Sequence, residues 1–153
     1  MRYSLANYYV SFTHTATDLT DLFDSVSIGG EYDTLSSIDI AYASNLWTTT
    51  GYATGAWVHA MNLDRHGTIT ITLSIISDNI DKFIKFCNLF YLNGAAYEGL
   101  TMTVTNTVSD VVLTATDCYI QKIPNLQLSA TPGNQQWVFT CGKIDFNENF
   151  TVI

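Results

Sequence analysis

HGTITITLS, residues 66–74, is the stretch of sequence from which the fold can be read. Threonine alternates with isoleucine or leucine through it, and a period of two is typical of a β-strand with one apolar face and one hydroxyl face. His66-Gly67 marks a turn before the strand. The pattern predicts a strand over residues 68–74 whose apolar face lies against a core.

A helix is expected soon after this strand. Ser77-Asp78 is a favourable N-cap, and Asn93-Gly94 is a stop signal. These signals predict one amphipathic helix over residues 78–92, with Lys82 and Lys85 on its polar side. Its apolar face is predicted to consist of Ile80, Phe83, Ile84, Cys87, Phe90 and Tyr91.

Further strands are expected on both sides of the helix, because the remaining segments are rich in β-branched and aromatic residues between turn signals. A hairpin is expected at Ser109-Asp110. Residues 17–33 are the least regular part and are expected to form a loop or a short helical turn. The expected strands are 3–15, 35–48, 56–63, 68–74, 100–107, 111–123 and 135–146. This order predicts a mainly β fold: an antiparallel β-sandwich or barrel of about seven strands, with the helix plugging one side.

The last predicted strand carries alternating large residues. Trp137, Phe139 and Cys141 are expected on one face, and Val138, Thr140, Ile144 and Phe146 on the other. A tryptophan in such a strand is more often a core or interface residue than a stacking platform for a sugar or base. Trp137 is therefore predicted to be a core or interface residue.

The longest uncharged stretch precedes residues 66–74. Residues 40–63 contain no Asp, Glu, Lys or Arg, yet they include Trp47, Tyr52 and Trp57. Threonine and glycine are too frequent there for a helix interior, and hydroxyls are too frequent for a bilayer core. Since interface cores are depleted of charge and enriched in aromatic residues, the stretch predicts an extended arm, around residues 45–57, that is buried against another copy of the protein.

The charge composition limits the partners that the protein can bind. Only 13% of residues are charged, about half the ~25% of typical soluble domains, and there are 21 threonines. The net charge is −8 without any basic run, so direct binding of nucleic-acid phosphates is disfavoured. Residues 3–64 carry seven carboxylates and no Lys or Arg. That acidic region is either a solvated face or a docking surface for a basic partner.

The length of 153 residues predicts one domain over residues 1–153. Cys87, Cys118 and Cys141 have no metal-binding spacing, and an odd number cannot all pair within one chain, so free buried thiols are expected. The start of the chain lacks the apolar core of a signal peptide, and no apolar stretch approaches ~18 residues. We expect folding in a reducing cytoplasm, without export and without insertion into a membrane.

Catalytic chemistry is not expected. His14, His59 and His66 could be combined with serines or cysteines on paper, but none lies in a nucleophile elbow or a metal-ligand spacing. The sequence predicts neither an enzyme nor a bound metal or cofactor. Asp64 and Arg65 are expected to form an ion pair at a subunit boundary, worth ~0–1 kcal/mol as a surface pair.

From residue 62 onward the series of segments resembles a known family. NLDRHG (62–67) leads into the predicted strand and helix, followed by CYIQKIP (118–124) and QWVFTCGKID (136–145). Over residues 35–146 this series is similar to the tail tube protein of contractile-tailed bacteriophages. The resemblance implies a β-sandwich or barrel subunit that forms hexameric rings, which stack into the hollow inner tube of the tail.

The resemblance also implies partners and roles. A sheath surrounds the tube, tape-measure protein fills it before ejection, and DNA passes through it without specific binding; baseplate and tail-terminator proteins meet its ends. The protein is then part of the virion tail, assembled in the host cytoplasm. Contacts between subunits or rings are expected at Trp47, Tyr52, Trp57, Asp64 and Arg65, channel-lining acids at Asp39 and Asp117, and sheath-facing acids at Asp18, Asp21 and Asp24.

Independent physical reasoning agrees with an assembly. A ring needs one surface that meets a different surface on the next copy. Residues 123–142 form a second uncharged run, which is consistent with another covered surface. Two alternatives stay open: the tube of a tail-like bacteriocin or related secretion machine, and a carbohydrate-binding β-sandwich that uses Trp47, Tyr52 and Trp57 as stacking surfaces.

Overall fold

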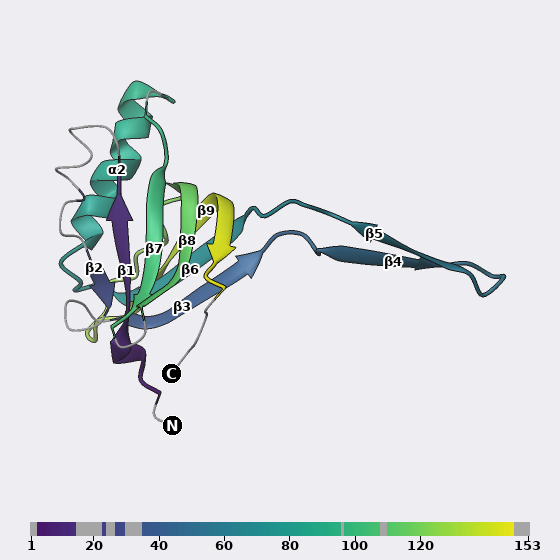
Figure 1. The fold of residues 1–153 in the computed structure, drawn as a ribbon. Helices are drawn as coiled ribbons and strands as arrows, with labels where there is room; N and C mark the ends of the chain where they lie inside the picture. The colour runs from purple at the N-terminus through teal and green to yellow at the C-terminus, as the bar shows by residue number, and fades with distance from the viewer. Residues whose placement is uncertain are drawn as a thin grey trace.

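The protein forms a curled β-sheet, one helix and a long projecting hairpin in a computed structural model, which describes residues 3–14, 23, 27–29, 35–95, 97–107 and 110–148 (Figure 1). The elements are η1 (Leu5–Asn7), β1 (Tyr8–Thr13), β2 (Ser27–Gly29), β3 (Leu35–Tyr42), β4 (Trp47–Gly51), β5 (Trp57–Met61), β6 (Gly67–Ser74), α2 (Ile80–Asn93), β7 (Leu100–Asn106), β8 (Asp110–Ile120) and β9 (Asn134–Phe146). The mainly β prediction is confirmed.

Seven strands form one antiparallel sheet in the order β2-β1-β7-β8-β9-β6-β3, curled into a half-barrel (Figure 1). The predicted strand over residues 68–74 is β6, which begins at Gly67 and lies between β9 and β3. β7 and β8 pair antiparallel, as the predicted hairpin requires; Asp110 is the first residue of β8, and Ser109 lies outside the described residues. The strands β4 and β5 form a separate two-stranded sheet.

The concave side of the sheet holds the core. Ile69, Ile71 and Leu73 are fully buried, as the alternation of β6 predicts. Ile71 is paired with Trp137, which is also fully buried, so the tryptophan is a core residue as expected. Phe83 of α2 packs against it with ring centroids 5.3 Å apart. At about 1.5–3 kcal/mol for each large apolar side chain, this burial is the main source of stability.

The helix α2 lies two residues later than predicted at its start. Its N-cap is Asn79, which makes no side-chain capping hydrogen bond, so the predicted Ser77-Asp78 cap is wrong. Gly94 ends the helix with φ +62°, as the stop signal predicts. The buried stripe consists of Phe83, Phe86 and Cys87.

Phe86 was missing from the predicted apolar face of the helix. It packs between Phe23 and Phe90, with ring centroids 5.4 and 5.0 Å away. The buried stripe is therefore rotated toward Phe86, and the predicted face residues Ile84 and Tyr91 are exposed. The aromatic cluster, rather than the helical period alone, decides which face points inward.

Part of the region expected to be a loop is a strand. β2 pairs with β1, and its central residue Ile28 is fully buried opposite Val10. A three-residue strand leaves too short an alternation to be recognised, and it is formed because β1 offers it a free edge. Apart from β2 and Phe23, which is buried, residues 17–33 lie outside the described residues.

The alternation of β8 and β9 breaks at a bulge around Asp117. Asp117 has φ +57°, and the pairing of β8 with β7 changes register between Leu100 and Met102. Gly99 leaves room for it, since a Cβ on Gly99 would lie 2.8 Å from Asp117. Beyond the bulge Ile144 is fully buried, so its predicted place on the outer face is wrong.

Candidate assembly surfaces

The predicted arm is the antiparallel hairpin of β4 and β5, which projects far from the body (Figure 1). The strand expected over 35–48 is two strands, because the chain leaves the sheet after Tyr42 and starts β4 at Trp47. At the tip, the Tyr52 N–H donates to the Ala56 carbonyl (2.9 Å) and the Gly55 N–H to the Tyr52 carbonyl (2.9 Å). Gly55 adopts φ +86°, which favours glycine in this turn.

Both faces of the hairpin are apolar or neutral, and every residue of β4 and β5 is exposed. The register places Trp47 beside Met61 and Trp57 beside Gly51 on one face, with the Thr49 Oγ1 to His59 Nδ1 hydrogen bond (2.8 Å) between them. Tyr52 follows Gly51 and lies at the start of the turn, outside β4. Trp47, Tyr52 and Trp57 are 55%, 56% and 66% exposed.

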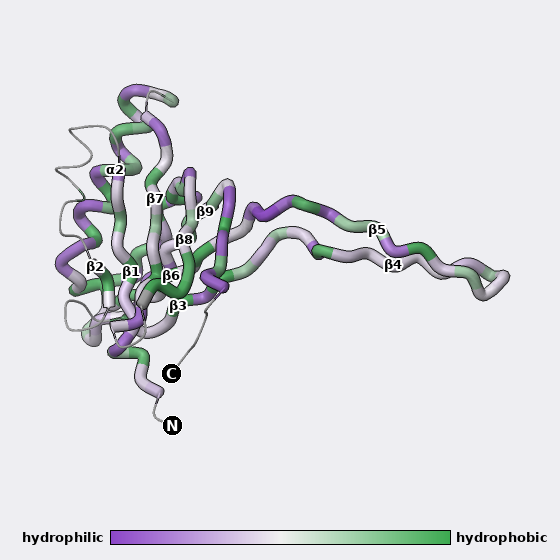
Figure 2. Tube along the Cα trace, in the orientation of Figure 1, coloured by the Kyte–Doolittle hydropathy of each residue, from purple (hydrophilic) through white to green (hydrophobic). Residues whose placement is uncertain are grey.

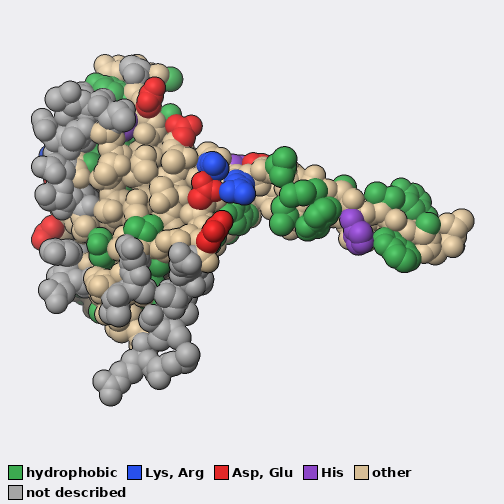
Figure 3. Space-filling model, in the orientation of Figure 1, with side chains coloured by type: hydrophobic (Ala, Val, Ile, Leu, Met, Phe, Trp, Pro, Cys, Tyr) green, Lys and Arg blue, Asp and Glu red, His purple; other side chains and the backbone are tan. Residues whose placement is uncertain are grey.

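These three aromatic residues do not form one stacking platform. Trp47 lies at the base of the hairpin, paired with Met61, whereas Trp57 and Tyr52 lie at the tip. Apolar side chains follow the arm along its length (Figure 3). Much of the hairpin is apolar or weakly polar, and of the two segments that join it to the body, the one between β5 and β6 contains the strongly hydrophilic stretches (Figure 2).

Charged side chains gather at the root of the arm (Figure 3). Arg65 pairs with Asp145 (2.6 Å), and Lys143 lies 3.3 Å from the same carboxylate. Asp64 pairs with His66, so the predicted Asp64–Arg65 ion pair is wrong: the two residues have different partners. The partner of Arg65 comes from β9, which is remote in sequence, and no sequence signal identified Lys143 or Asp145 as residues of this site.

Hydrogen bonds fix the root against the body. The Tyr42 hydroxyl donates to the Ile144 carbonyl (2.6 Å), and the Ile144 N–H donates to the Arg65 carbonyl (3.0 Å). The Arg65 guanidinium lowers the pKa of Asp145, and the His66 side chain lowers the pKa of Asp64 by hydrogen bonding. Both carboxylates are therefore held in their charged forms, which favours these contacts.

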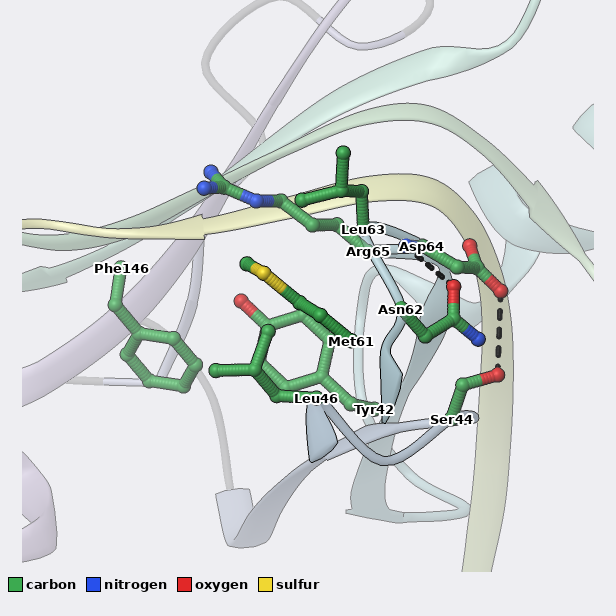
Figure 4. Close-up of a pocket in the computed structure, with 9 residues that line it drawn as sticks. All are labelled: Tyr42, Ser44, Leu46, Met61, Asn62, Leu63, Asp64, Arg65 and Phe146. Carbon is green, nitrogen blue, oxygen red and sulfur yellow. Dashed lines mark hydrogen bonds between the residues drawn. The ribbon is translucent and has the colours of Figure 1, made fainter. Parts of the chain in front are cut away.

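A hollow of about 360 Å³ lies beside the root (Figure 4). On one side, Ser44 donates to Asp64 (3.2 Å) and the Asp64 N–H donates to Asn62 (3.0 Å). On the other side, the side chains of Tyr42, Leu46 and Met61 lie close together (Figure 4). The hollow therefore has one polar side and one apolar side. Its lining residues come from the end of β3, from the two segments that join the hairpin to the sheet, and from β5 and β9.

The sheet face opposite the core carries rows of hydroxyl groups. Register pairs Thr103 with both Ser11 and Thr114, and it pairs Thr68 with Thr140. We call this surface the hydroxyl face; it consists of Tyr9, Ser11, Thr13, Ser37, Asp39, Ala41, Thr68, Thr70, Thr72, Gln136, Val138, Thr140, Thr101, Thr103, Thr105, Thr114 and Thr116.

Of the acids expected to line a channel, Asp39 is an exposed residue of the hydroxyl face, opposite Thr70. Asp117 is exposed at the bulge beside Gly142, at the end of the same face. It is not a regular strand residue, because its backbone is in the left-handed region. The predicted sheath-facing residues Asp18, Asp21 and Asp24 lie outside the described residues.

Exposed apolar residues outside the arm come from two segments, the end of α2 and the uncharged run, which we together call the second apolar surface. Tyr91 and Leu92 at the end of α2 are 76% and 82% exposed, and Leu126 and Leu128 in the uncharged run are 59% and 78% exposed. A hollow of about 370 Å³ lies between α2 and the end of β8. Its apolar lining includes Phe86, Phe90, Tyr91, Tyr119, Ile120 and Ile123. The sequence predicted a covered surface for the uncharged run, residues 123–142, but did not indicate that the end of α2 also carries exposed apolar residues.

The structure does not bring the three histidines together with one another or with the cysteines. His14 Nε2 lies 2.5 Å from the Glu98 carbonyl oxygen, His59 contacts Thr49, and His66 contacts Asp64. The predicted free, buried state of Cys87, Cys118 and Cys141 is confirmed. Within the described ranges, no three His, Cys, Asp or Glu side chains form a group that could hold a metal ion. Among the same residues, no helix has the length and hydropathy of a membrane span.

Comparison with known proteins gives one family match. The family model described as "Bacteriophage PhiTE tail tube protein" matches residues 8–147. A search of curated protein sequences finds no match.

Several solved structures share the fold at low sequence identity. A chain of a PVC extracellular contractile injection system sheath-tube complex in the extended state is 14% identical, with a TM-score of 0.58, covering 96% of this chain and 92% of that one. A chain of the PVC sheath/tube terminator is 14% identical (TM-score 0.60; 96% and 97% covered). A chain of the anti-feeding prophage tube-terminating cap is 13% identical (TM-score 0.58; 96% and 91% covered).

Proposed function

The chain belongs to the bacteriophage PhiTE tail tube protein family, and from this premise we propose that it is a structural subunit whose copies assemble into stacked rings, forming the inner tube of a contractile tail. Hexameric rings and the passage of DNA through them are part of this proposal. Residues 1–153 act as one domain with the hairpin as its arm, and the subunit performs no catalysis and needs no cofactor. Its place is the virion tail, after assembly in the host cytoplasm.

The exposed hairpin is the observation that carries the proposal. An isolated two-stranded hairpin is marginally stable in water, and this one lacks ionic side chains that would favour its solvation. Burial of Trp47, Tyr52 and Trp57 against a neighbouring copy would remove a large apolar area from water at about 25 cal/mol per Å². The arm therefore functions as the contact between subunits or rings, with Asp64 and Arg65 fixing its root.

The second apolar surface supplies the other half of such a contact. The arm leaves the body on the side away from α2 (Figure 1), so one chain cannot cover its own arm with the end of that helix. A surface that meets a different surface on the next copy gives a head-to-tail contact, which closes into rings or extends into stacks. Exposed Tyr91, Leu92 and Leu128 are suited to that role because they are apolar and lie outside the body's core.

The hydroxyl face is the surface that we assign to the channel. Threonine hydroxyls keep it wettable without positive charge, and Asp39 and Asp117 add negative charge that repels phosphate. DNA would then pass without adhering to the wall. The acids Asp18, Asp21 and Asp24 are assigned to the exterior, toward the sheath, with tape-measure, baseplate and terminator proteins as the remaining partners.

Light scattering after size exclusion and negative-stain microscopy of the full chain test the assembly. We expect rings or tubes whose abundance rises with concentration; a compact monomer at all concentrations would contradict the proposal. Trp47→Asp and Tyr52→Asp should abolish stacking while circular dichroism stays unchanged, because each puts a charge into the buried contact. Tyr52→Phe is the matched control and should assemble. Normal assembly of both Asp variants would remove the arm from the mechanism.

A further inference from the structure

Two of the three cysteines form a close pair in the core. Cys118 of β8 and Cys141 of β9 are directly opposite each other in the antiparallel register. Their sulfur atoms are 3.1 Å apart, and the Cys118 thiol donates to Cys141. A disulfide bond is about 2.0 Å long, so closing the pair needs a movement of about 1 Å. We propose that Cys118 and Cys141 are a dithiol site that oxidises to a disulfide within one chain.

The surroundings of the pair permit this movement. Cys118 is fully buried and Cys141 is 3% exposed, while Asp117 and Gly142, each one residue away from a cysteine, are exposed. The bulge at Asp117 interrupts the regular pairing with β7 there. On the other side, Cys141 is paired with Gly67 of β6, which has no side chain to restrain it. Small opening motions at a bulge cost less than opening a continuous ladder.

The hydrogen bond also differentiates the two sulfur atoms. Donation by the Cys118 thiol lowers the pKa of Cys141 and raises the pKa of Cys118. The thiolate is the reactive form of cysteine, so Cys141 is the sulfur that meets the oxidant first. Cys118 is already in place as the resolving thiol. Cys87 of α2 has neither advantage, because burial raises its pKa to about 11.

Hydrogen peroxide is sufficient as the oxidant. The Cys141 thiolate attacks one peroxide oxygen, the O–O bond breaks, and a sulfenic acid forms while hydroxide leaves and is protonated to water. The Cys118 sulfur then attacks the Cys141 sulfur; the S–S bond forms, the S–O bond breaks, and the Cys118 proton leaves with hydroxide as a second water. Two thiols and one peroxide give one disulfide and two waters. In a reducing cytoplasm the pair stays as two thiols.

The bridge would fix a specific part of the fold. The two cysteines are 23 positions apart, and the closed loop contains the exposed segment between β8 and β9. Cys141 is also the last residue of β9 that pairs with β6. Beyond it, β9 is paired only with β8, up to Phe146, so the bridge would lie at the point where the pairing with β6 ends. Oxidation after release from the host would stabilise the subunit without altering its outer surfaces.

Counting free thiols in the full chain tests the proposal. The reduced, desalted protein is treated with hydrogen peroxide, denatured, alkylated and weighed intact. We expect one alkylated thiol instead of three, a loss of about 2 Da at the bridge, and a melting temperature about 5–10 °C higher that dithiothreitol reverses. Cys87→Ser should keep the 2 Da loss, whereas Cys118→Ser and Cys141→Ser should lose it.

Peptide mapping of the wild-type chain gives an answer that does not depend on the folding of any variant. Cleavage by trypsin after Lys85 and Lys122, combined with a glutamate-specific protease at Glu98, separates the three cysteines into different peptides. A cross-linked pair that contains Cys118 and Cys141 confirms the site. Three alkylated thiols after peroxide, a bridge to Cys87, or bridges only between chains would each overturn it.

Discussion

The pairs β6–β9 and β4–β5 are both antiparallel and both carry a tryptophan, but their surroundings are opposite. In the body, Trp137 is paired with Ile71 and both are fully buried beneath α2. In the arm, Trp57 is paired with Gly51 and is 66% exposed. Backbone pairing is antiparallel in both places, so the difference lies in the layer that covers the strands. In the body, α2 and the core cover Trp137, whereas β4 and β5 are exposed on the isolated chain, and we propose that a neighbouring copy covers them.

Truncating the two tryptophans should give the largest contrast. Trp137→Ala leaves a cavity beneath Phe83 and is expected to lower the free energy of unfolding by about 3–5 kcal/mol. Trp57→Ala removes an exposed ring from the isolated chain and should change it by less than about 0.5 kcal/mol. Urea titration of both monomeric variants measures the difference. Equal destabilisation would show that the arm packs on its own body.

Hydrogen exchange should separate the isolated chain from the assembly. The Tyr52 and Asn62 amides of the arm are hydrogen-bonded but unprotected by packing, so fast exchange is expected in the monomer and at least about hundredfold slower exchange in assembled particles. Amides of β6 should exchange slowly in both states. Equal rates for residues 45–57 in the two states would remove the basis for burial of the arm.

Two glycines sharpen the comparison at the backbone level. A Cβ on Gly67 would collide with the Ala41 carbonyl oxygen of the neighbouring strand, so Gly67→Ala should cost about 1–3 kcal/mol of unfolding free energy. Gly51 has no neighbour within 4 Å of such a Cβ, and Gly51→Ala should be close to neutral in the monomer. Thermal unfolding of the pair is the measurement. A strongly destabilised Gly51→Ala monomer would contradict the open arm.

The smallest effect is expected at the root between the two regions. Arg65 lowers the pKa of Asp145 below its ordinary 3.8, so the ion pair's contribution is fully present above about pH 4 and is lost as the pH falls through the lower folded value. Arg65→Met should raise the pKa of Asp145, and its stability deficit should be larger at pH 7 than at pH 2. Proton NMR titration and urea unfolding measure these changes.

Lys85→Met is the matched control for this prediction, since Lys85 pairs with Asp81 on α2 (3.7 Å) and is remote from the root. It removes the same charge and should leave the Asp145 titration unchanged. A deficit in Arg65→Met that is independent of pH would mean that the guanidinium acts by packing rather than by charge.

Regular alternation was the reliable signal in the sequence. It predicted β6 and the buried face around Trp137 and Phe139. The Asn93-Gly94 stop signal predicted the end of the helix at Gly94. Both signals depend only on residues that are close together in the sequence. Local periodicity failed for Ile144, where the bulge reverses the faces, and for Phe86, whose burial depends on Phe23. Both errors arise where a contact from elsewhere in the chain overrides the local period.

The assembly surfaces were predictable to different degrees. The uncharged stretch directly indicated an extended aromatic arm, because the absence of charged residues over 24 positions is a property of the sequence itself. The partners of Asp64 and Arg65 were not predictable, since His66 competes for one and Asp145 is 80 positions away from the other. The contribution of the helix end to the second apolar surface likewise needed the orientation of α2.

The sequence by itself determined a mainly β chain with one helix and an uncharged aromatic arm, because side-chain period, helix stop signals and missing charge are local properties. Only the tertiary structure decided that β2 joins the sheet, that the arm is a hairpin clear of the body, and that Cys118 meets Cys141. These features depend on which distant strands pair and in which register, and that choice is made by the packing of the whole core rather than by any one segment.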